Sequence, residues 1–421
     1  MKILVIGSGA REHAVCRAFK QSKRKSEIFC AEGNAGIAQI AECVDIKPYE
    51  IDNLAAFAQE TKIDLTFVGG ETALALGVVD EFERRNLKIV GASRKAARLE
   101  ASKAFAKDFM RRHEIPTAHY EIANSVDEAK KILDGGAFGD ANSPVVVKAD
   151  GLAAGKGVVV AASRAEAVEA INELENLAGK NAAEKIVLEE FLSGGEVSLL
   201  LFADGENFAL MPPARDHKRI GEGDTGANTG GMGTISDASI LSDEQSVEVI
   251  EKIVKPTLSG ARAEGFPFRG ILFLGLMITG DGTKLLEYNA RFGDPETQAI
   301  LVRLDTDFVE ICEAICARKL TDLTIDWKSG SSACIVLAAK NYPRTPKTGD
   351  RIFGLENVAE DVQIFHAGTA NDADGNFITA GGRVLSVTAT AENLTGALEK
   401  AYAAVDAINF DGMQFRGDIG K

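Results

Sequence analysis

The residues best suited to chemistry lie in one run, Glu287-Tyr-Asn-Ala-Arg-Phe-Gly-Asp-Pro-Glu-Thr-Gln298. The run follows a Gly-Asp-Gly turn at 280–282, which predicts the second strand of a hairpin that leads into a polar loop. Because strand side chains alternate between two faces, Glu287, Asn289 and, if the strand continues, Arg291 should point the same way. A carboxylate beside a carboxamide offers oxygen ligands to a hard cation such as magnesium, and a guanidinium can hold a phosphoryl oxygen. The run therefore predicts a metal–nucleotide–substrate site.

A second charged group flanks a glycine-rich loop at 149–157, between predicted strands 145–148 and 158–161. The loop misses the spacing of a P-loop, and it joins two strands rather than a strand and a helix. A lysine at the end of an apolar strand is costly to bury without an anion. Lys148 and the loop residue Lys156 therefore predict a lid that closes over a triphosphate, with an ordinary flexible hairpin as the alternative.

Two further segments are weaker signals. The run Glu189-Glu190-Phe-Leu192 separates two predicted strands and can offer backbone groups to an adenine edge, while Glu196 can accept hydrogen bonds from ribose hydroxyls. A solvated connector is the alternative. Residues 212–234 are polar and rich in glycine, with little periodicity. A loop of this length inside a compact domain is usually functional, and a disordered surface loop is the alternative.

Residues 1 to about 100 alternate strands with helices, which predicts a parallel sheet whose ligands bind beyond the carboxyl ends of the strands. The predicted strands are 3–6, 28–31, 64–68 and 88–90, and the predicted helices are 12–21, 52–61 and 72–85. Gly7-Ser-Gly9 follows the first strand, but Glu12 replaces the third glycine of a dinucleotide fingerprint. We interpret this loop as a monophosphate site with Arg11 or Glu12 beside it. A tight turn without a ligand is equally compatible.

The rest of the chain predicts two further units. Helices are expected over 102–113, 164–177 and 243–264, and a hairpin over 271–289. From about residue 330 the pattern changes to strands 332–338, 362–366 and 383–388 followed by helix 392–408, which predicts a small α+β unit. We therefore expect an α/β and α+β multidomain protein with domains over 1–101, 102–328 and 329–421.

Composition limits the possible functions. A formal net charge of -15 over 421 residues argues against a nucleic-acid or anionic-membrane surface. The opening Met-Lys-Ile-Leu-Val-Ile-Gly predicts a buried strand rather than a signal peptide, and no apolar run reaches membrane-spanning length. Six scattered cysteines without a Cys-x-x-Cys pair fit a reducing cytosol. Without a visible covalent nucleophile, the chemistry is expected to be phosphoryl transfer.

These residues resemble the glycinamide ribonucleotide synthetase family of the ATP-grasp superfamily, and the resemblance runs from end to end. The matching motifs are Gly7–His13, Gly33–Gly36, Leu99-Glu-x-Ser-Lys103, Lys148–Gly157, Glu189–Leu192, Asp216–Arg219, Asn228–Gly233, Arg291–Gln298, Phe365–Thr369, Gly381–Leu385 and Arg416–Gly420. The Arg-Phe-Gly-Asp-Pro-Glu run is the most specific of them. The resemblance implies a central ATP-grasp domain with a mobile lid subdomain at about 119–192.

The resemblance also implies a reaction and a set of roles. ATP, glycine and 5-phosphoribosylamine would give glycinamide ribonucleotide, ADP and phosphate through glycyl phosphate. The implied ATP contacts are Lys103, Lys148, Lys156, Glu189, Glu190, Leu192 and Glu196, and the implied ligands of Mg²⁺ or Mn²⁺ are Glu287 and Asn289. Arg291, Asp294 and Lys156 would act in catalysis, with Asp294 on the glycine ammonium. The implied phosphoribosylamine contacts are Gly9, Arg11, Glu12, Asn34, Gly70, Glu71, Asp216, Lys218 and Gly231.

One departure and two alternatives remain. The family usually has Gly-Pro-Glu where this chain has Gly69-Gly70-Glu71, and a glycine frees a turn that proline would stiffen. Another ATP-grasp carboxylate–amine ligase or carboxylase is the first alternative. A nicotinamide-binding oxidoreductase or nucleotide sensor is the second. We expect a cytoplasmic monomer that binds small molecules and neither nucleic acid nor membrane.

Overall fold

The computed structural model describes residues 1–152, 157–178 and 184–421, and in these residues the amino-terminal part forms a parallel sheet as predicted. The strand order is β3-β2-β1-β4-β5, and every pair is parallel. The elements are β1 (Lys2–Gly7), α1 (Ala10–Lys20), β2 (Glu27–Glu32), β3 (Glu42–Val44), α2 (Ile51–Thr61), β4 (Leu65–Val68), α3 (Glu71–Leu76), α4 (Val78–Arg84) and β5 (Ile89–Val90). The single helix predicted over 72–85 is wrong, because Gly77 adopts a φ of +91° and separates α3 from α4.

The segment predicted as a lid forms an antiparallel sheet of its own with the order β6-β9-β7-β8. Two short helices, α5 (Arg98–Ala101) and α6 (Lys103–Arg112), lead into it. The elements are β6 (Tyr120–Ala123), α7 (Val126–Asp134), β7 (Val145–Ala149), β8 (Val158–Ala161), α8 (Arg164–Ala178) and β9 (Ile186–Glu190). Because β9 extends to Glu190, the connector interpretation of Glu189 and Glu190 is wrong.

The remaining strands build one long sheet with the order β17-β16-β10-β12-β15-β18-β22-β19, and β11 pairs with β10. These strands are β10 (Gly195–Asp204), β11 (Phe208–Leu210), β12 (Ala214–Asp216), β15 (Gly233–Ser236), β16 (Arg269–Thr279), β17 (Gly282–Asn289), β18 (Ser331–Ala338), β19 (Gln363–His366) and β22 (Arg383–Ala391). Two small hairpins, β13 (Arg219–Gly221) with β14 (Thr225–Asn228) and β20 (Thr369–Asn371) with β21 (Phe377–Thr379), complete the strands. The predicted loop at 212–234 is therefore largely short strands.

The helices of this part are α9 (Asp243–Val249), α10 (Lys255–Ala263), α11 (Glu296–Leu301), α12 (Phe308–Ala317) and α13 (Leu394–Ala407). A π-helical turn at Ile250–Val254 joins α9 to α10, so the predicted helix at 243–264 is present with a local irregularity. The carboxy-terminal unit is α+β as predicted. Its strands extend the central sheet through the pairing of β15 with β18, which the sequence analysis did not foresee.

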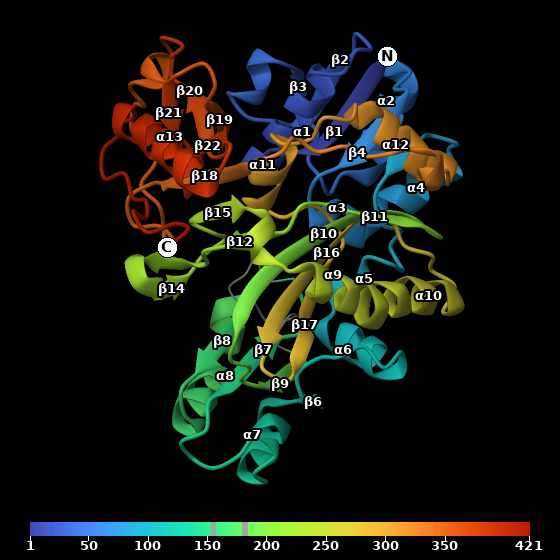
Figure 1. The fold of residues 1–421 in the computed structure, drawn as a ribbon, viewed down its shortest axis with the longest axis vertical. Coiled ribbons are helices and arrows are strands. Elements are labelled where there is room, and N and C mark those ends of the chain that lie inside the picture. Colours follow the sequence, from blue (N-terminus) through green and yellow to red (C-terminus); the bar gives the residue numbers. More distant parts are fainter. Residues whose placement is uncertain (153–156, 179–183) are drawn as a thin grey trace.

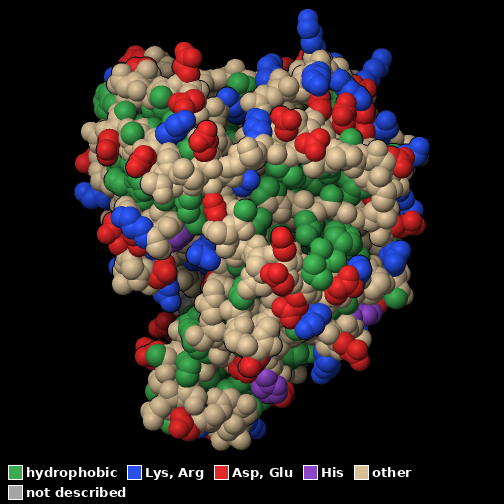
Figure 2. Space-filling view, in the orientation of Figure 1, with side chains coloured by type: hydrophobic (Ala, Val, Ile, Leu, Met, Phe, Trp, Pro, Cys, Tyr) green, Lys and Arg blue, Asp and Glu red, His purple; other side chains and the backbone are tan. Residues whose placement is uncertain are grey.

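The amino-terminal and carboxy-terminal parts lie side by side at one end of the molecule, and the β6–β9 sheet projects from the other end (Figure 1). A cluster of buried aromatic rings joins the amino-terminal sheet to the central part. Phe67 and Phe292 lie 5.8 Å apart between ring centroids, and Phe308 contacts both. Phe292 is fully buried, so it anchors the loop that contains Arg291 and Asp294. Charged side chains of both signs are interspersed over the face in Figure 2, and no helix in the described ranges is long and apolar enough to cross a bilayer.

Candidate active site

Strand β17 presents Glu287 and Asn289 on one half-buried face, with Tyr288 buried between them. A β-bulge helps to set this arrangement. Glu287 pairs with Gly275 and Leu285 with Leu276, so Leu286 is an extra residue that shifts the alternation of side chains. The strand ends at Asn289, so it does not continue to Arg291 as the sequence interpretation had allowed.

The carboxylate of Glu287 has no hydrogen-bond or ion-pair partner among the described residues. Burial disfavours its charged form, but the surrounding cations Lys218, Lys148, Lys103 and Arg291 lower the pKa of Glu287 below its usual range. An ionised carboxylate without a partner, next to the amide oxygen of Asn289, is a donor set that suits a hard cation. No cluster of three or more His, Cys, Asp or Glu residues that could hold a metal occurs in the described ranges. A cation here would take most of its ligands from water and phosphate, as Mg²⁺ commonly does.

Arg291 lies two residues beyond the end of strand β17 and is held by several groups. Its Nη2 lies 2.8 Å from Glu100 Oε1 and donates to Asn289 Oδ1 at 3.1 Å. Its Nε donates to Glu71 Oε2 at 3.2 Å, and its Nη1 to the carbonyl of Phe292 at 3.0 Å. The guanidinium is thus fixed beside Asn289, and the structure places Glu71 against Arg291.

The anion beside Lys148 in this structure is Glu189. Lys148 Nζ lies 2.7 Å from Glu189 Oε1, and Lys107 Nζ lies 2.9 Å from Glu189 Oε2. All three side chains are buried. Burial opposes the charge of Glu189, but the two lysines lower its pKa, while burial lowers the pKa of Lys107 to about 8. Lys107 also donates to Thr117 Oγ1 at 2.7 Å. Lys107 is not among the residues predicted from the sequence, although a lysine on the buried face of a helix is a visible signal.

Lys103 begins helix α6 and lies at the base of the glycine-rich loop. Its Nζ donates to the carbonyl of Gly151 at 3.2 Å, and burial lowers its pKa. Asp150 holds this helix start, because its Oδ1 accepts from the Ala104 amide at 2.7 Å and from Ser102 Oγ at 3.0 Å. Lys103 and Lys148 are therefore placed near Glu287. The third predicted lysine, Lys156, lies outside the described residues.

Glu190 and Glu196 make contacts that join separate elements. Glu190 Oε1 accepts from the His119 amide at 2.8 Å and from Lys284 Nζ at 3.2 Å, which ties β9 to β17. Glu196 Oε2 lies 2.9 Å from Lys218 Nζ. Although burial opposes it, the charge of Glu196 raises the pKa of Lys218. Leu192 is half-buried in the connection between β9 and β10.

The loops that follow strands β1, β2 and β4, here called the amino-terminal rim, are held by hydrogen bonds and ion pairs within the protein. Glu12 is buried, and its Oε2 accepts from the Gly9 amide at 2.7 Å while its Oε1 lies 2.6 Å from Arg11 Nε. Asn34 donates at 2.8 Å to the carbonyls of Ser8 and His366 and accepts from the Gly36 and Ile37 amides. The side chains of Glu12 and Asn34 therefore have partners within the protein, and their substrate roles stay predictions.

Asp294 lies where all three parts of the chain meet. Its Oδ1 accepts from Gln298 Nε2 at 2.8 Å, and Arg383 Nη2 lies 3.3 Å from its Oδ2. A Cβ built on Gly9 would lie 3.3 Å from the same oxygen. The sequence analysis missed Arg383, although its Gly-Gly-Arg-Val-Leu context was among the motifs of the resemblance.

Asp216 and Glu296 form a second acidic group in the same region. Asp216 Oδ1 accepts from the His217 amide at 2.8 Å, and it would lie 2.6 Å from a Cβ on Gly231, which has a φ of +108°. Glu296 is buried and accepts from Ser198 Oγ at 3.0 Å. Burial raises the pKa of both carboxyls, and their mutual repulsion adds to the shift of Asp216.

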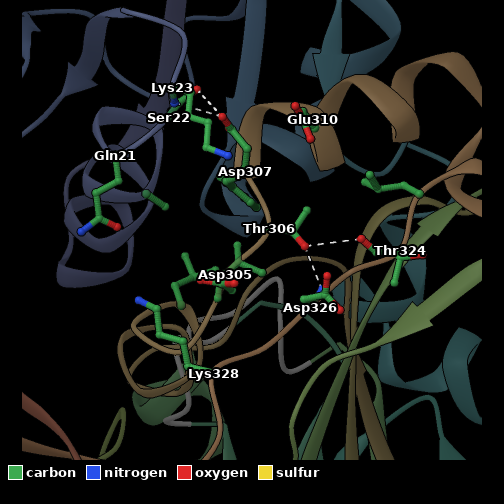
Figure 3. Close-up of a pocket in the computed structure, with 15 residues that line it drawn as sticks. Gln21, Ser22, Lys23, Asp305, Thr306, Asp307, Glu310, Thr324, Asp326 and Lys328 are labelled. Atoms are coloured by element: carbon green, nitrogen blue, oxygen red, sulfur yellow. Dashed lines mark hydrogen bonds between the residues drawn. The ribbon is translucent and has the colours of Figure 1, made fainter.

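A cavity of about 530 Å³ lies away from these residues, between the end of α1 and the start of α12 (Figure 3). Asp307 at its edge accepts from Ser22 Oγ at 2.8 Å and from the Lys23 amide at 3.1 Å. None of the predicted site residues lines this cavity. The candidate active site is instead the region between the β6–β9 sheet, strand β17 and the amino-terminal rim.

The region combines the acidic and amide side chains of strand β17, buried lysines and the β6–β9 sheet, and comparison with known proteins identifies the class of the chain. Residues 101–297 match the description "Phosphoribosylglycinamide synthetase, ATP-grasp (A) domain". Residues 1–100 match the N domain of that synthetase, and residues 332–421 match its C domain. The chain is therefore an ATP-grasp protein.

Relatives along the whole chain narrow this class. A phosphoribosylamine–glycine ligase of Xanthomonas axonopodis pv. citri is 47% identical over 100% of this chain and 97% of its own. A phosphoribosylamine–glycine ligase of Salmonella typhimurium is 46% identical over 100% of this chain and 98% of its own. The Thermotoga maritima phosphoribosylamine–glycine ligase is 32% identical in sequence. Its crystal structure has a TM-score of 0.85 and covers 99% of this chain and 100% of its own. This chain belongs to the phosphoribosylglycinamide synthetase family.

A more distant structure shares the fold alone. The biotin carboxylase domain of Hydrogenobacter thermophilus 2-oxoglutarate carboxylase, solved with MgADP and bicarbonate, has a TM-score of 0.74 at 18% identity, with coverage of 98% of this chain and 91% of its own.

Proposed function

We propose that this protein joins glycine to 5-phosphoribosylamine, with cleavage of ATP to ADP and phosphate, and so acts in purine biosynthesis. The observation that carries the proposal is the similarity of 45–47% identity to phosphoribosylamine–glycine ligases over the full length of this chain. Conserving one reaction is the simplest account of such end-to-end similarity.

The reaction proceeds in two steps in this proposal. The glycine carboxylate attacks the γ-phosphate of ATP to form glycyl phosphate and ADP, and the amine of phosphoribosylamine then attacks the acyl carbon and releases phosphate. Lys103, Lys148 and Lys156 bind the ATP phosphates, and Arg291 steadies the transferring phosphoryl group. Their positive charges offset the charge that develops in transfer. Lys148 exchanges its contact with Glu189 for phosphate when ATP binds.

The remaining ATP and metal contacts follow the same logic. The backbone around Glu189, Glu190 and Leu192 reads adenine, and Glu196 accepts from the ribose. Glu287 and Asn289 hold Mg²⁺ or Mn²⁺, and the metal, when bound, neutralises charge on the phosphates. The lowered pKa of Glu287, whose carboxylate has no partner in the part of the chain that the structure describes, supports this assignment.

The acceptor and glycine contacts involve all three parts of the chain. Asp294 meets the glycine ammonium. The proposed phosphoribosylamine contacts are Gly9, Arg11, Glu12, Asn34, Gly70, Glu71, Asp216, Lys218 and Gly231. For Glu12, Asn34 and Glu71 the internal bonds described above favour a supporting role, in which they shape the rim. We retain the domain limits 1–101, 102–328 and 329–421, with a lid at about 119–192. The family models match residues 1–100, 101–297 and 332–421.

We also propose a monomer that works in the cytoplasm. The six free cysteines support a reducing compartment.

Product analysis tests the proposed substrates. Purified protein is incubated with ATP, magnesium, phosphoribosylamine and one carboxylic acid at a time, and products are identified by mass spectrometry. Glycinamide ribonucleotide from glycine, and no amide from alanine or acetate, is the expected result. Efficient coupling of another carboxylic acid, or carboxylation by bicarbonate, would favour the alternative ATP-grasp reaction.

A further inference from the structure

Glu100 belongs to the Leu-Glu-x-Ser-Lys run at 99–103, and no role has been assigned to it. It lies in the short helix α5, and its side chain is only 7% exposed. An ionisable carboxyl group in such a position is unfavourable unless a cation or a set of donors holds it. Its partners therefore indicate what it does.

Both oxygens of Glu100 hold the same short stretch of chain. Oε1 lies 2.8 Å from Arg291 Nη2, and Oε2 accepts a hydrogen bond of 2.8 Å from the amide of Ala290. Ala290 is the residue between Asn289 and Arg291. One carboxylate therefore fixes both the guanidinium and the peptide group that connects it to the metal strand.

The other carboxylate on Arg291 is held less firmly. Glu71 lies 3.2 Å from Arg291 Nε and is 30% exposed, and it also interacts with the charge of Arg11. Glu71 is thus partly exposed and interacts with the charges of two guanidinium groups. Glu100 is closer to Arg291 and more buried, so it is the contact that sets where the guanidinium lies.

Glu100 also lies in the segment that places a phosphate-binding lysine. Lys103 follows three residues later, where its Nζ donates to the Gly151 carbonyl at 3.2 Å. The turn from α5 to α6 therefore sets the spacing between the lysine at the loop base and the arginine at the end of β17.

We propose that Glu100 is a positioning residue for phosphoryl transfer, which holds Arg291 in register with Glu287 and Asn289. The inference rests on the proposed role of Arg291 in the reaction. Transfer by positioning and electrostatics is sensitive to displacements of about 1 Å, so a looser Arg291 would slow the chemical step more than it would weaken substrate binding.

The test replaces Glu100 by glutamine. Glu100→Gln keeps the size of the side chain and an oxygen for the Ala290 amide, but removes the charge opposite Arg291. We expect kcat to fall about 10- to 100-fold, with the KM for ATP and for glycine and the melting temperature almost unchanged. The matched control is Glu264→Gln, at a position away from the site. This change removes a carboxylate that accepts from Arg112 at 2.9 and 3.0 Å. The kcat of this variant should equal that of the wild type.

A double-variant comparison separates this inference from the proposed function. If Glu100 acts through Arg291, Glu100→Gln combined with Arg291→Lys should be no slower than Arg291→Lys alone. If the losses of kcat in the two single variants multiply in the double variant, the inference about Glu100 is overturned, but the proposed function is not. The same holds if Glu100→Gln has a normal kcat while Arg291→Lys is slow. A normal kcat for Arg291→Lys would instead remove the proposed role of Arg291. If Glu100→Gln does not fold, Glu100→Asp retracts the charge by one methylene, and an unchanged kcat would overturn the inference.

Discussion

At the scale of single residues, the most informative feature is the charge state of Glu287. Four cations lower its pKa although burial opposes this, and no described residue pairs with it. An ionised group that the protein surrounds with positive charge and leaves without a partner is typical of a functional site. We interpret it as the anchor for a hard cation.

Changing Asn289, the second residue of the proposed metal site, tests this interpretation. Asn289→Asp replaces a neutral oxygen donor with a charged one beside Glu287, so the metal should bind more tightly and the magnesium concentration for half-maximal turnover should fall about tenfold, which corresponds to about 1.4 kcal/mol. Turnover is measured over a magnesium titration. Asn371→Asp, an exposed asparagine in β20, is the control. The same magnesium dependence in wild type and Asn289→Asp would contradict a ligand role.

Sequence motifs supplied most residues of the candidate site. The residues that the motifs did not indicate have partners that are distant in the chain. Glu287 and Asn289 could be predicted because both lie in one strand and their chemistry is visible in their types. Arg383 could not be assigned, because its partner Asp294 lies 89 residues away in sequence and only the fold brings them together. The same holds for Glu100, whose contacts are at Ala290 and Arg291.

At the scale of elements, alternating patterns predicted the long strands and helices, and tertiary pairing decided the rest. The strands β12 and β15 are only three and four residues long and carry polar residues and glycine, so local propensity did not reveal them. The bulge at Leu286 depends on pairing with Gly275 and Leu276, which no pattern within one strand encodes. Gly77 ended α3 where the apolar pattern continued.

The loop between β4 and α3 gives a prediction at this scale. A Cβ on Gly69 would lie 2.6 Å from Glu12 Cγ, and Glu12 is held by the Gly9 amide and by Arg11. Gly69→Ala should therefore lower the free energy of unfolding by about 1–3 kcal/mol through overpacking, measured by urea denaturation.

Gly70 is the matched control. It also stands where the family usually has proline, so the same variant tests how constrained this position is. Its φ is -108°, which other residues adopt, and a Cβ would approach only the flexible Arg11 Nη2 at 3.1 Å. Gly70→Ala should leave stability almost unchanged. A loss as large as that of Gly69→Ala would show that the loop is constrained in a way the geometry does not predict.

At the scale of the whole molecule, the amino-terminal and carboxy-terminal parts meet through two buried histidines. The His366 amide donates to His13 Nδ1 at 2.9 Å, and Asn34 donates to the His366 carbonyl. The three matched domains could be predicted from the sequence as separate units. The joining of the central and carboxy-terminal parts into one sheet and this histidine contact could not, because both depend on surfaces formed only in the folded chain.

This contact predicts a dependence of stability on pH. Burial lowers the pKa of His13 to about 3 and that of His366 to about 4, with the charges of His366 and Arg17 adding to the shift of His13. Below pH 6.5 the unfolded chain binds protons that the folded protein does not. Stability should therefore fall as the pH falls from 6.5 toward these values, by up to about 1.4 kcal/mol per pH unit for each histidine.

His13→Asn removes one of these groups and keeps an acceptor for the His366 amide. Urea denaturation at pH 7.5, 6 and 5 should show a weaker loss of stability with acid than in the wild type. His119→Asn, an exposed histidine on the lid, should not alter the pH dependence. An identical slope for His13→Asn and wild type would contradict the assignment.

The measurement that tests the central claim most directly is ADP release from ATP and magnesium, with and without glycine and freshly made phosphoribosylamine. Sustained release that requires both substrates, one ADP for each glycinamide ribonucleotide formed, is the predicted result. Release at the same rate without phosphoribosylamine or without glycine, or no release with both present, would contradict the assignment of this chain as the ligase.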